Sequence, residues 1–250
     1  MKHKMLAILV VVALFNVTTH AEDVPSLKKS EEYHDIPVKV VKEVPLPKGW
    51  HEGLYFDGEN MWVNNGEGIN TWIVDVATGE VISEIEPVGT FSEGITPAGD
   101  GTYWVTDWET KKLYRVKITD GRMENLYDIL LEPSRPTGVV WTGEHLYVIT
   151  WTRGLGTRYH IMELTENERM VRKMRIRGIH EPSQMAWDGK HLWITSWYTK
   201  RVYRVDIENF RVLGSFRSPT SETTGIAWDG EYLWVTGTRS GLFQVEILED

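Results

Sequence analysis

The stretch Thr224-Gly-Ile-Ala-Trp-Asp-Gly230 recurs in four other forms along the 250-residue chain. Each copy has an aliphatic residue near its centre and ends in a glycine turn. The other copies are Glu52-Gly-Leu-Tyr-Phe-Asp-Gly58, Glu93-Gly-Ile-Thr-Pro-Ala-Gly-Asp-Gly101, Thr137-Gly-Val-Val-Trp-Thr-Gly143 and Ser183-Gln-Met-Ala-Trp-Asp-Gly189. The aliphatic positions are spaced by 41, 44, 46 and 41 residues. Such a period, carried by short strands and tight turns, is typical of a β-propeller.

Each copy predicts the first strand of a four-stranded unit. Alternating apolar residues after it predict a second strand such as 233–236, a third such as 202–206 and an outer one such as 212–216. The fifth unit has no outer strand of its own, and Val38 to Val44 has no other partner. We therefore predict an all-β, five-bladed β-propeller over residues 37–250, closed by this N-terminal strand completing the last blade. An open β-sandwich is the alternative.

The first 21 residues have the pattern of a secretory signal peptide. Lys2 and Lys4 precede the apolar run from Met5 to Phe15, and Ala21 offers a small residue at a cleavage point. The run is shorter than the roughly 20 apolar residues that span a bilayer. We expect residues 1–21 to be removed and the protein to be exported to the periplasm or beyond, with an uncleaved anchor as the alternative. The polar residues 22–36 predict a flexible leader.

The charge balance excludes some partners. The full chain has a formal charge of −9, and without residues 1–21 it keeps 25 basic against 36 acidic residues, or −11. A nucleic-acid partner requires a basic surface, and an anionic membrane repels an acidic protein. We therefore predict no nucleic-acid partner and no membrane association after signal cleavage. The chain has no cysteine, so no disulfide supports the fold.

The first letters of the repeats predict a site. In a propeller the first strand of each unit lines the central channel, so its start and the end of the second strand share one face of the disc. Glu52 and Glu93 occupy the first position in two units, where the others have threonine or serine. We predict that a peptide or small-molecule substrate binds at this face. The residues that follow the second strands, with one later neighbour, are Asn65, Asp107, Trp108, Trp151, Trp197 and Arg239.

Paired carboxyls in a narrow channel suit proton transfer. Two such groups repel each other, so at least one acquires a raised pKa, as general acid/base catalysis requires. We predict Glu93 and Glu52 as catalytic residues, although each could be a plain turn residue. The tryptophans can serve as pocket walls or as packing between blades. No metal-binding or phosphate-binding motif occurs, and we predict no metal and no cofactor.

Several motifs resemble the glutaminyl cyclases of the plant and bacterial type. Phe91-Ser92-Glu93-Gly94-Ile95-Thr96 resembles the family's F-G-E-G-I-T, and Trp50 to Leu54 stands where the family has F-T-(Q/E)-G-L. Thr106-Asp107-Trp108 is similar to its L-T-W, and Val235 to Phe243 to its V-T-G-K-R-W-P-x-L-(F/Y). This order covers all five units.

The resemblance implies a zinc-independent, five-bladed acyltransferase. Such enzymes convert an N-terminal glutamine to pyroglutamate and release ammonia. The sequence departs from the family at Gln184, where N-E-L-E-W has its first glutamate, and at Thr238, where V-T-G-K has lysine. Thr137-Gly138 likewise replaces Glu-Gly. Gln184 keeps the capacity to bind an amide substrate by hydrogen bonds.

These departures leave two alternatives to the cyclase. One is a noncatalytic propeller that binds a ligand or peptide on the tryptophan-lined face. The other is a metal-dependent propeller of the lactonase or streptogramin-lyase kind, where similar Gly-Ile-Ala-Trp-Asp-Gly phrases occur.

Overall fold

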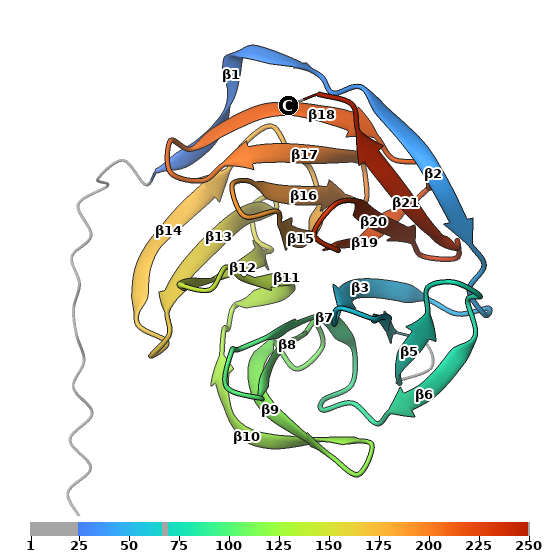
Figure 1. Ribbon diagram of the computed structural model, residues 1–250. Coiled ribbons are helices and arrows are strands. Elements are labelled where there is room, and N and C mark those ends of the chain that lie inside the picture. The colour runs from blue at the N-terminus through green and yellow to red at the C-terminus, as the bar shows by residue number, and fades with distance from the viewer. Residues whose placement is uncertain (1–24, 67–69, 250) are drawn as a thin grey trace, which may run out of the picture.

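The computed structural model describes residues 25–66 and 70–249, and these residues form an all-β propeller without a helix (Figure 1). Four-stranded antiparallel units follow the repeats, and each runs from the centre of the disc outward. In the order of the units, the strands are β3 (His51–Phe56), β4 (Asn60–Asn65), β5 (Thr71–Asp75), β6 (Val81–Ile85); β7 (Ser92–Pro97), β8 (Tyr103–Asp107), β9 (Lys112–Thr119), β10 (Arg122–Leu130); β11 (Ser134–Trp141), β12 (His145–Thr152), β13 (Arg158–Thr165), β14 (Met170–Ile176); β15 (Pro182–Trp187), β16 (Leu192–Ser196), β17 (Arg201–Asp206), β18 (Arg211–Arg217); and β19 (Thr223–Trp228), β20 (Leu233–Gly237), β21 (Leu242–Ile247).

The N-terminal strand β2 (Val38–Val44) completes the last unit. It pairs antiparallel with β21, from Val38 opposite Ile247 to Val44 opposite Leu242. The chain ends are thereby held in one sheet, and the exposed edge of the last unit is covered. The inner strands β3, β7, β11, β15 and β19 contact one another in sequence order, and β19 contacts β3. They form a ring about the axis of the disc.

The flexible leader predicted for residues 22–36 is wrong over most of its length. Ser26–Asp35 forms strand β1, which pairs in parallel with the outer strands β14 and β18. Leu27, fully buried against the core of the third and fourth units, explains why this polar segment is ordered. The predicted signal peptide lies outside the described residues.

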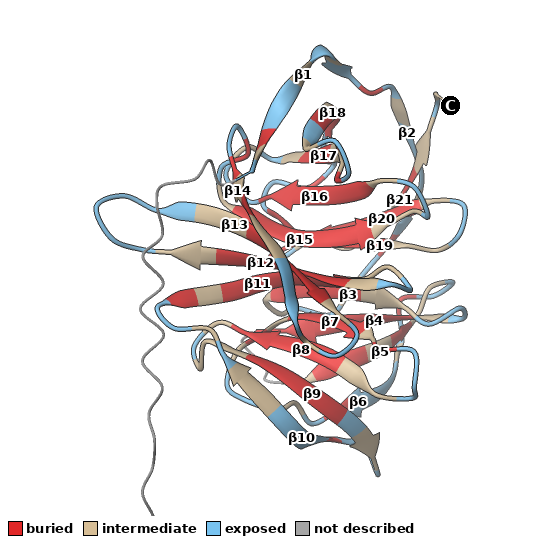
Figure 2. Ribbon diagram, turned by 90° about the vertical axis from the view of Figure 1, so that its left-hand side faces the viewer, coloured by how far each residue is buried: buried red, intermediate tan, exposed pale blue. Residues whose placement is uncertain are grey.

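The inner strands consist mostly of buried residues (Figure 2). Apolar side chains pack between neighbouring units. The repeat explains this regularity, because each second strand contributes a buried tryptophan or tyrosine, and in three units the indole also bonds to the aspartate of the preceding turn. The indole Nε1 of Trp62, Trp193 and Trp234 donates to Asp57, Asp188 and Asp229 over 2.6–2.8 Å. The Asp-Gly dipeptides therefore fix both the turn and the indole that packs beside it. In the part of the chain that the structure covers, we find no helical segment capable of crossing a bilayer.

Candidate functional site

The two repeat-initial glutamates lie in one cavity at the channel mouth. Glu52 is the second residue of β3, after His51, and Glu93 is the second residue of β7, after Ser92. The cavity measures about 230 Å³, the liquid volume of about eight waters. Its lining combines the predicted Glu52, Glu93, Trp108, Trp151 and Trp197 with Trp50, Phe91, Glu109, Thr137, Ser183 and Thr224.

The glycine after the first residue of the repeat allows the inner strands to approach closely. A Cβ atom built on Gly53 would lie 2.4 Å from the carbonyl oxygen of Glu93, and one on Gly225 would lie 2.3 Å from that of Glu52. No side chain fits at either separation, so these glycines let β3 pack closely against β7 and β19, and Glu52 and Glu93 lie on adjacent inner strands.

Glu52 is buried and oriented by a neighbouring indole. The residue is only 6% exposed, and its Oε1 accepts a hydrogen bond from Nε1 of Trp50. Burial raises the pKa of Glu52 to about 8, and the Trp50 hydrogen bond opposes the rise. The group therefore titrates near neutral pH, where a general acid or base is most effective.

Glu93 lies in the same cavity and keeps partial exposure through it. Burial, followed by repulsion from Glu52, Asp107 and Glu109, raises the pKa of Glu93 well above its usual range. Close carboxyls cannot both ionise easily, so the Glu52–Glu93 pair retains protons at a pH where exposed glutamates have lost them.

Aromatic rings wall the cavity. Trp108 and Trp151 meet edge to face with centroids 5.4 Å apart. Nε1 of Trp151 donates to the carbonyl of Pro182 over 2.7 Å, and the guanidinium of Arg135 lies 5.1 Å from the Trp108 ring centroid. Trp197 is 39% exposed at the rim. These contacts fix two rings and leave a third open to solvent.

Gln184 lies beneath the cavity and outside its lining. Nε2 donates to the carbonyl of Glu93 over 3.1 Å, and Oε1 accepts from the backbone N–H groups of Val139 and Met185 over 2.9 and 3.0 Å. A Cβ atom on Gly94 would meet its Nε2 at 2.4 Å. The expected substrate contact is therefore corrected, because the amide fills the channel axis and satisfies backbone groups.

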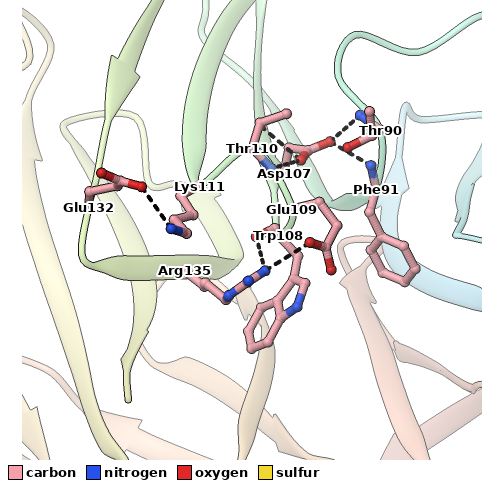
Figure 3. A network of polar contacts seen from close by, with 9 residues as sticks. All are labelled: Thr90, Phe91, Asp107, Trp108, Glu109, Thr110, Lys111, Glu132 and Arg135. Carbon is pink, nitrogen blue, oxygen red and sulfur yellow. Dashed lines mark hydrogen bonds and ion pairs between the residues drawn. The ribbon is translucent and has the colours of Figure 1, made fainter. Parts of the chain in front are cut away.

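Asp107 is likewise structural (Figure 3). It is fully buried, and Oδ2 accepts from the backbone N–H groups of Thr90 and Phe91 over 2.7 and 2.6 Å. Oδ1 accepts from the backbone and the hydroxyl of Thr110 over 2.7 and 2.8 Å. Its predicted substrate role is corrected, since the Oδ2 bonds hold the loop that carries Phe91 and the Oδ1 bonds hold the turn at Thr110.

Asn65 and Arg239 also lie outside the cavity lining. Oδ1 of Asn65 accepts from the backbone N–H of Trp50 over 3.3 Å, which positions the indole that binds Glu52. The Arg239 guanidinium lies 5.5 Å from the Trp50 ring centroid and lines a separate cleft with His51. Both residues therefore contact Trp50, the residue whose indole binds Glu52.

Six lining residues were not among the predicted site residues: Thr137, Ser183 and Thr224, which begin the other repeats, and Trp50, Phe91 and Glu109. Trp50 and Phe91 each lie two residues before a glutamate of the pair. Because side chains two residues apart in an extended chain lie on the same face, this spacing was the signal that could have predicted them. Glu109 follows Trp108 in the loop after β8, and Arg135 donates to it over 3.2 Å (Figure 3). No strand pattern indicates the direction of that loop side chain.

The far end of the channel is a different environment. A cavity of about 160 Å³ is lined there by apolar and aromatic residues, among them Phe56, Trp141, Trp187 and Trp228. Neither cavity is lined by Gln184, which is 3% exposed between them. Across residues 25–66 and 70–249, no three His, Cys, Asp or Glu side chains gather in a group that could hold a metal ion.

Comparisons with solved structures find the same fold. The glutaminyl cyclase of Myxococcus xanthus is similar with a TM-score of 0.70 and 13% sequence identity, over 88% of this chain and all of that one. The PQQ-bound aldose sugar dehydrogenase of Streptomyces coelicolor has a TM-score of 0.56 and 12% identity, over 84% of this chain and 98% of that one. The virginiamycin B lyase of Staphylococcus aureus superposes less well, with a TM-score of 0.48 and 19% identity, over 79% of this chain and 66% of that one.

Sequence comparisons add no family assignment. No family model matches the chain, and no curated protein matches it. The expected resemblance to a glutaminyl cyclase is therefore confirmed in the fold, whereas the activity does not follow from 13% identity.

Proposed function

We propose that this protein is an exported glutaminyl-peptide cyclotransferase-like enzyme, with the five four-stranded units acting as the five blades of a closed propeller. The observation that carries the proposal is the convergence of Glu52 and Glu93, both with raised pKa values, in one tryptophan-walled cavity. The motif around Glu93 and the fold shared with a glutaminyl cyclase support the same activity.

The reaction forms one bond and breaks another. The neutral α-amine of an N-terminal glutamine attacks its own side-chain amide carbon, and the C–N bond to the departing nitrogen then breaks. The ionised carboxylate of Glu93 takes a proton from the attacking amine and returns it to the leaving nitrogen, so ring amide and ammonia are the only products. Such proton handling typically contributes about 10²–10⁴-fold in rate.

Glu52 and the rings act on the same substrate group. Repulsion from Glu52 helps to raise the pKa of Glu93, which brings it closer to that of the α-amine. The indoles of Trp108 and Trp151 exclude water and suit a small substrate terminus. Gln184 supports the carbonyl of Glu93 from below without moving a proton.

The direct test is ammonia release from glutamine-initiated peptides. We expect the purified mature protein to release one ammonia per peptide and to leave the N-acetylated peptide unchanged, because acetylation removes the nucleophile. The assay is repeated after treatment with a chelator, and the rate should persist. Absence of turnover across a broad set of glutamine-initiated peptides would overturn the proposal.

A second candidate is binding without catalysis. Glu52, Glu93 and the surrounding rings provide the negative charge and aromatic faces that attract an organic ammonium group. At the positions where the cyclase motifs have an acid and a lysine, Gln184 and Thr238 are both buried. Quenching of tryptophan fluorescence by amine-terminated peptides, without ammonia release, would favour this function.

A further inference from the structure

The outer strands of the third unit carry a row of cations on one face. On β13 and β14, His160 lies directly opposite Arg175, and Tyr159 lies opposite Ile176. Continuing this register by one residue brings Arg158 beside Arg177. Because side chains alternate along a strand, these four residues share a face, together with Lys173. The other face, with Ile161, Met174 and Ile176, packs in the core toward the fourth unit.

These cations have no acidic partners among the described residues. Arg158, Lys173, Arg175 and Arg177 form no ion pair within residues 25–66 and 70–249. The contrast is Arg172 on the same strand, which lies opposite Glu163 and forms an ion pair with it. Like charges that lie close together on one face of a sheet repel, so the uncompensated row costs free energy even in a chain whose formal charge is −9.

The lowered pKa of His160 reflects its burial and the positive electrostatic potential around it. Burial and the charges of Lys173, Arg175 and Arg158 all lower its pKa, to about 4, and no negative charge acts on it. Its buried Nδ1 has no hydrogen-bond partner in the described part of the chain. A neutral ring with an unmatched polar atom thus lies among positive groups.

The row borders two adjoining clefts. Arg175, Arg177 and His180 line one of about 630 Å³, and His160 and Lys173 line another of about 410 Å³. Arg158 lines both, so the two clefts adjoin at this residue, and we treat them together as one hollow bordered by the cations. The hollow shares no lining residue with the cavity of Glu52 and Glu93.

We propose that this hollow, which we call the β13–β14 cleft, binds a phosphate-type oxyanion, either free or in a phosphate ester. Arginine guanidinium groups bind phosphate oxygens through paired, charge-assisted hydrogen bonds, and several converge here. A dianion supplies the charge that the protein omits opposite Arg175 and Arg177, and it relieves their repulsion. The overall negative charge keeps extended polyanions away, so the recognition is local.

A titration with pyrophosphate at constant ionic strength tests the proposal. The imidazole NMR signals of His160 should shift saturably, and the bound anion should raise the pKa of His160. R158Q/R175Q should weaken binding at least ten-fold, since each arginine contributes charged hydrogen bonds. The matched control is R217Q, an exposed arginine on β18, and it should bind as the wild type does. Equal weakening in R217Q would overturn the proposal. Absence of saturable shifts would also overturn it, unless the protein binds phosphate-bearing vesicles in the experiment described next.

Two further arms identify the source of the phosphate and check folding. Binding to vesicles of phosphatidylglycerol but not of phosphatidylcholine, with no response to pyrophosphate, would assign a lipid headgroup, whereas response to pyrophosphate assigns a soluble ligand. Binding of neither would contradict the site. In phosphate-free buffer, R158Q/R175Q should unfold at or above the wild-type temperature because like charges are removed. A lower temperature would contradict the repulsion on which the inference depends.

Discussion

The side-chain amide of Gln184 on β15 donates a 3.1 Å hydrogen bond to the backbone carbonyl of Glu93 on β7, although β11 lies between these two strands in the inner ring. Four units have glycine at this repeat position, and only the fourth has a long side chain. That side chain reaches Gly53 on β3, Gly94 on β7 and Val139 on β11, which are the inner strands of three other units. Gln184 therefore ties together the strands that carry both site glutamates.

Replacing Gln184 by the repeat's own glycine should destabilise the protein. Q184G leaves the buried carbonyl of Glu93 and the N–H of Val139 without their partners, at about 1–3 kcal/mol for each unsatisfied group. Urea unfolding measures the loss. Q184E is the matched variant, since it keeps the size but donates only when protonated, so its deficit should grow as the pH rises. A Q184G protein as stable as wild type would show that the amide is dispensable.

The fold was predictable because it is repetitive. The period set the units, and the unpartnered Val38 to Val44 indicated the strand that completes the last one, as β2 does. Ser26 to Asp35 was mistaken for a flexible leader because its polar composition conceals one decisive contact, the buried Leu27. Composition averages over a segment, whereas a strand held in parallel between β14 and β18 needs only backbone bonds and one apolar anchor.

Only those site residues whose positions follow from the strand pattern could be predicted. The period placed Glu52 and Glu93 together, and it placed the tryptophans after the second strands near them. It did not show that Asp107 turns back to the loop of Thr90 and Phe91, because the direction of a side chain at a strand end depends on that loop. The role of Gln184 was predicted wrongly because the other four repeats have glycine at this position, so they do not show where a long side chain would lie.

Removing the Glu52 carboxyl should move the pH dependence of turnover. Repulsion from Glu52 contributes to the raised pKa of Glu93, and Glu93 acts as a base only when ionised. In E52Q the rise of kcat/KM with pH should therefore occur at lower pH than in the wild type. The comparison is a pH–rate profile of both proteins, and an unchanged profile would mean that the two carboxyls do not interact.

The same substitution should change how stability depends on pH. The pKa of Glu52 is about 8 in the folded protein against an ordinary 4.5, so its protonation stabilises the fold at low pH. That contribution is lost as the pH rises from 4.5 to 8, and about 1.4 kcal/mol corresponds to each pKa unit. The free energy of unfolding of wild type relative to E52Q should fall by a few kcal/mol over this range. A constant difference in urea unfolding would contradict the buried, titrating carboxyl.

Trp108 should contribute to substrate binding more than to the fold. W108A removes a cavity wall and the edge-to-face contact with Trp151. We expect KM for a glutamine-initiated peptide to rise about ten-fold, equivalent to about 1.4 kcal/mol, with a smaller change in kcat. W228A, in the cavity at the far end of the channel, is the control and should leave KM unchanged. Equal effects of the two variants would point to general loosening of the fold.

Asp107 should prove structural. D107A leaves the N–H groups of Thr90, Phe91 and Thr110 without their acceptor, at about 1–3 kcal/mol for each buried group that finds no water. D107N keeps one acceptor oxygen and should lose less. Thermal unfolding ranks the three proteins, and a D107A variant of wild-type stability but without activity would restore a direct substrate role.

The mass of a glutamine-initiated peptide after incubation with wild type and with E93Q, side by side, tests the central claim most directly. E93Q keeps the size and backbone contacts of Glu93 but cannot accept and return a proton. The proposed chemistry predicts that wild type lowers the peptide mass by one ammonia, and that E93Q does so at least about 100-fold more slowly. Equal loss of ammonia in both samples would contradict it.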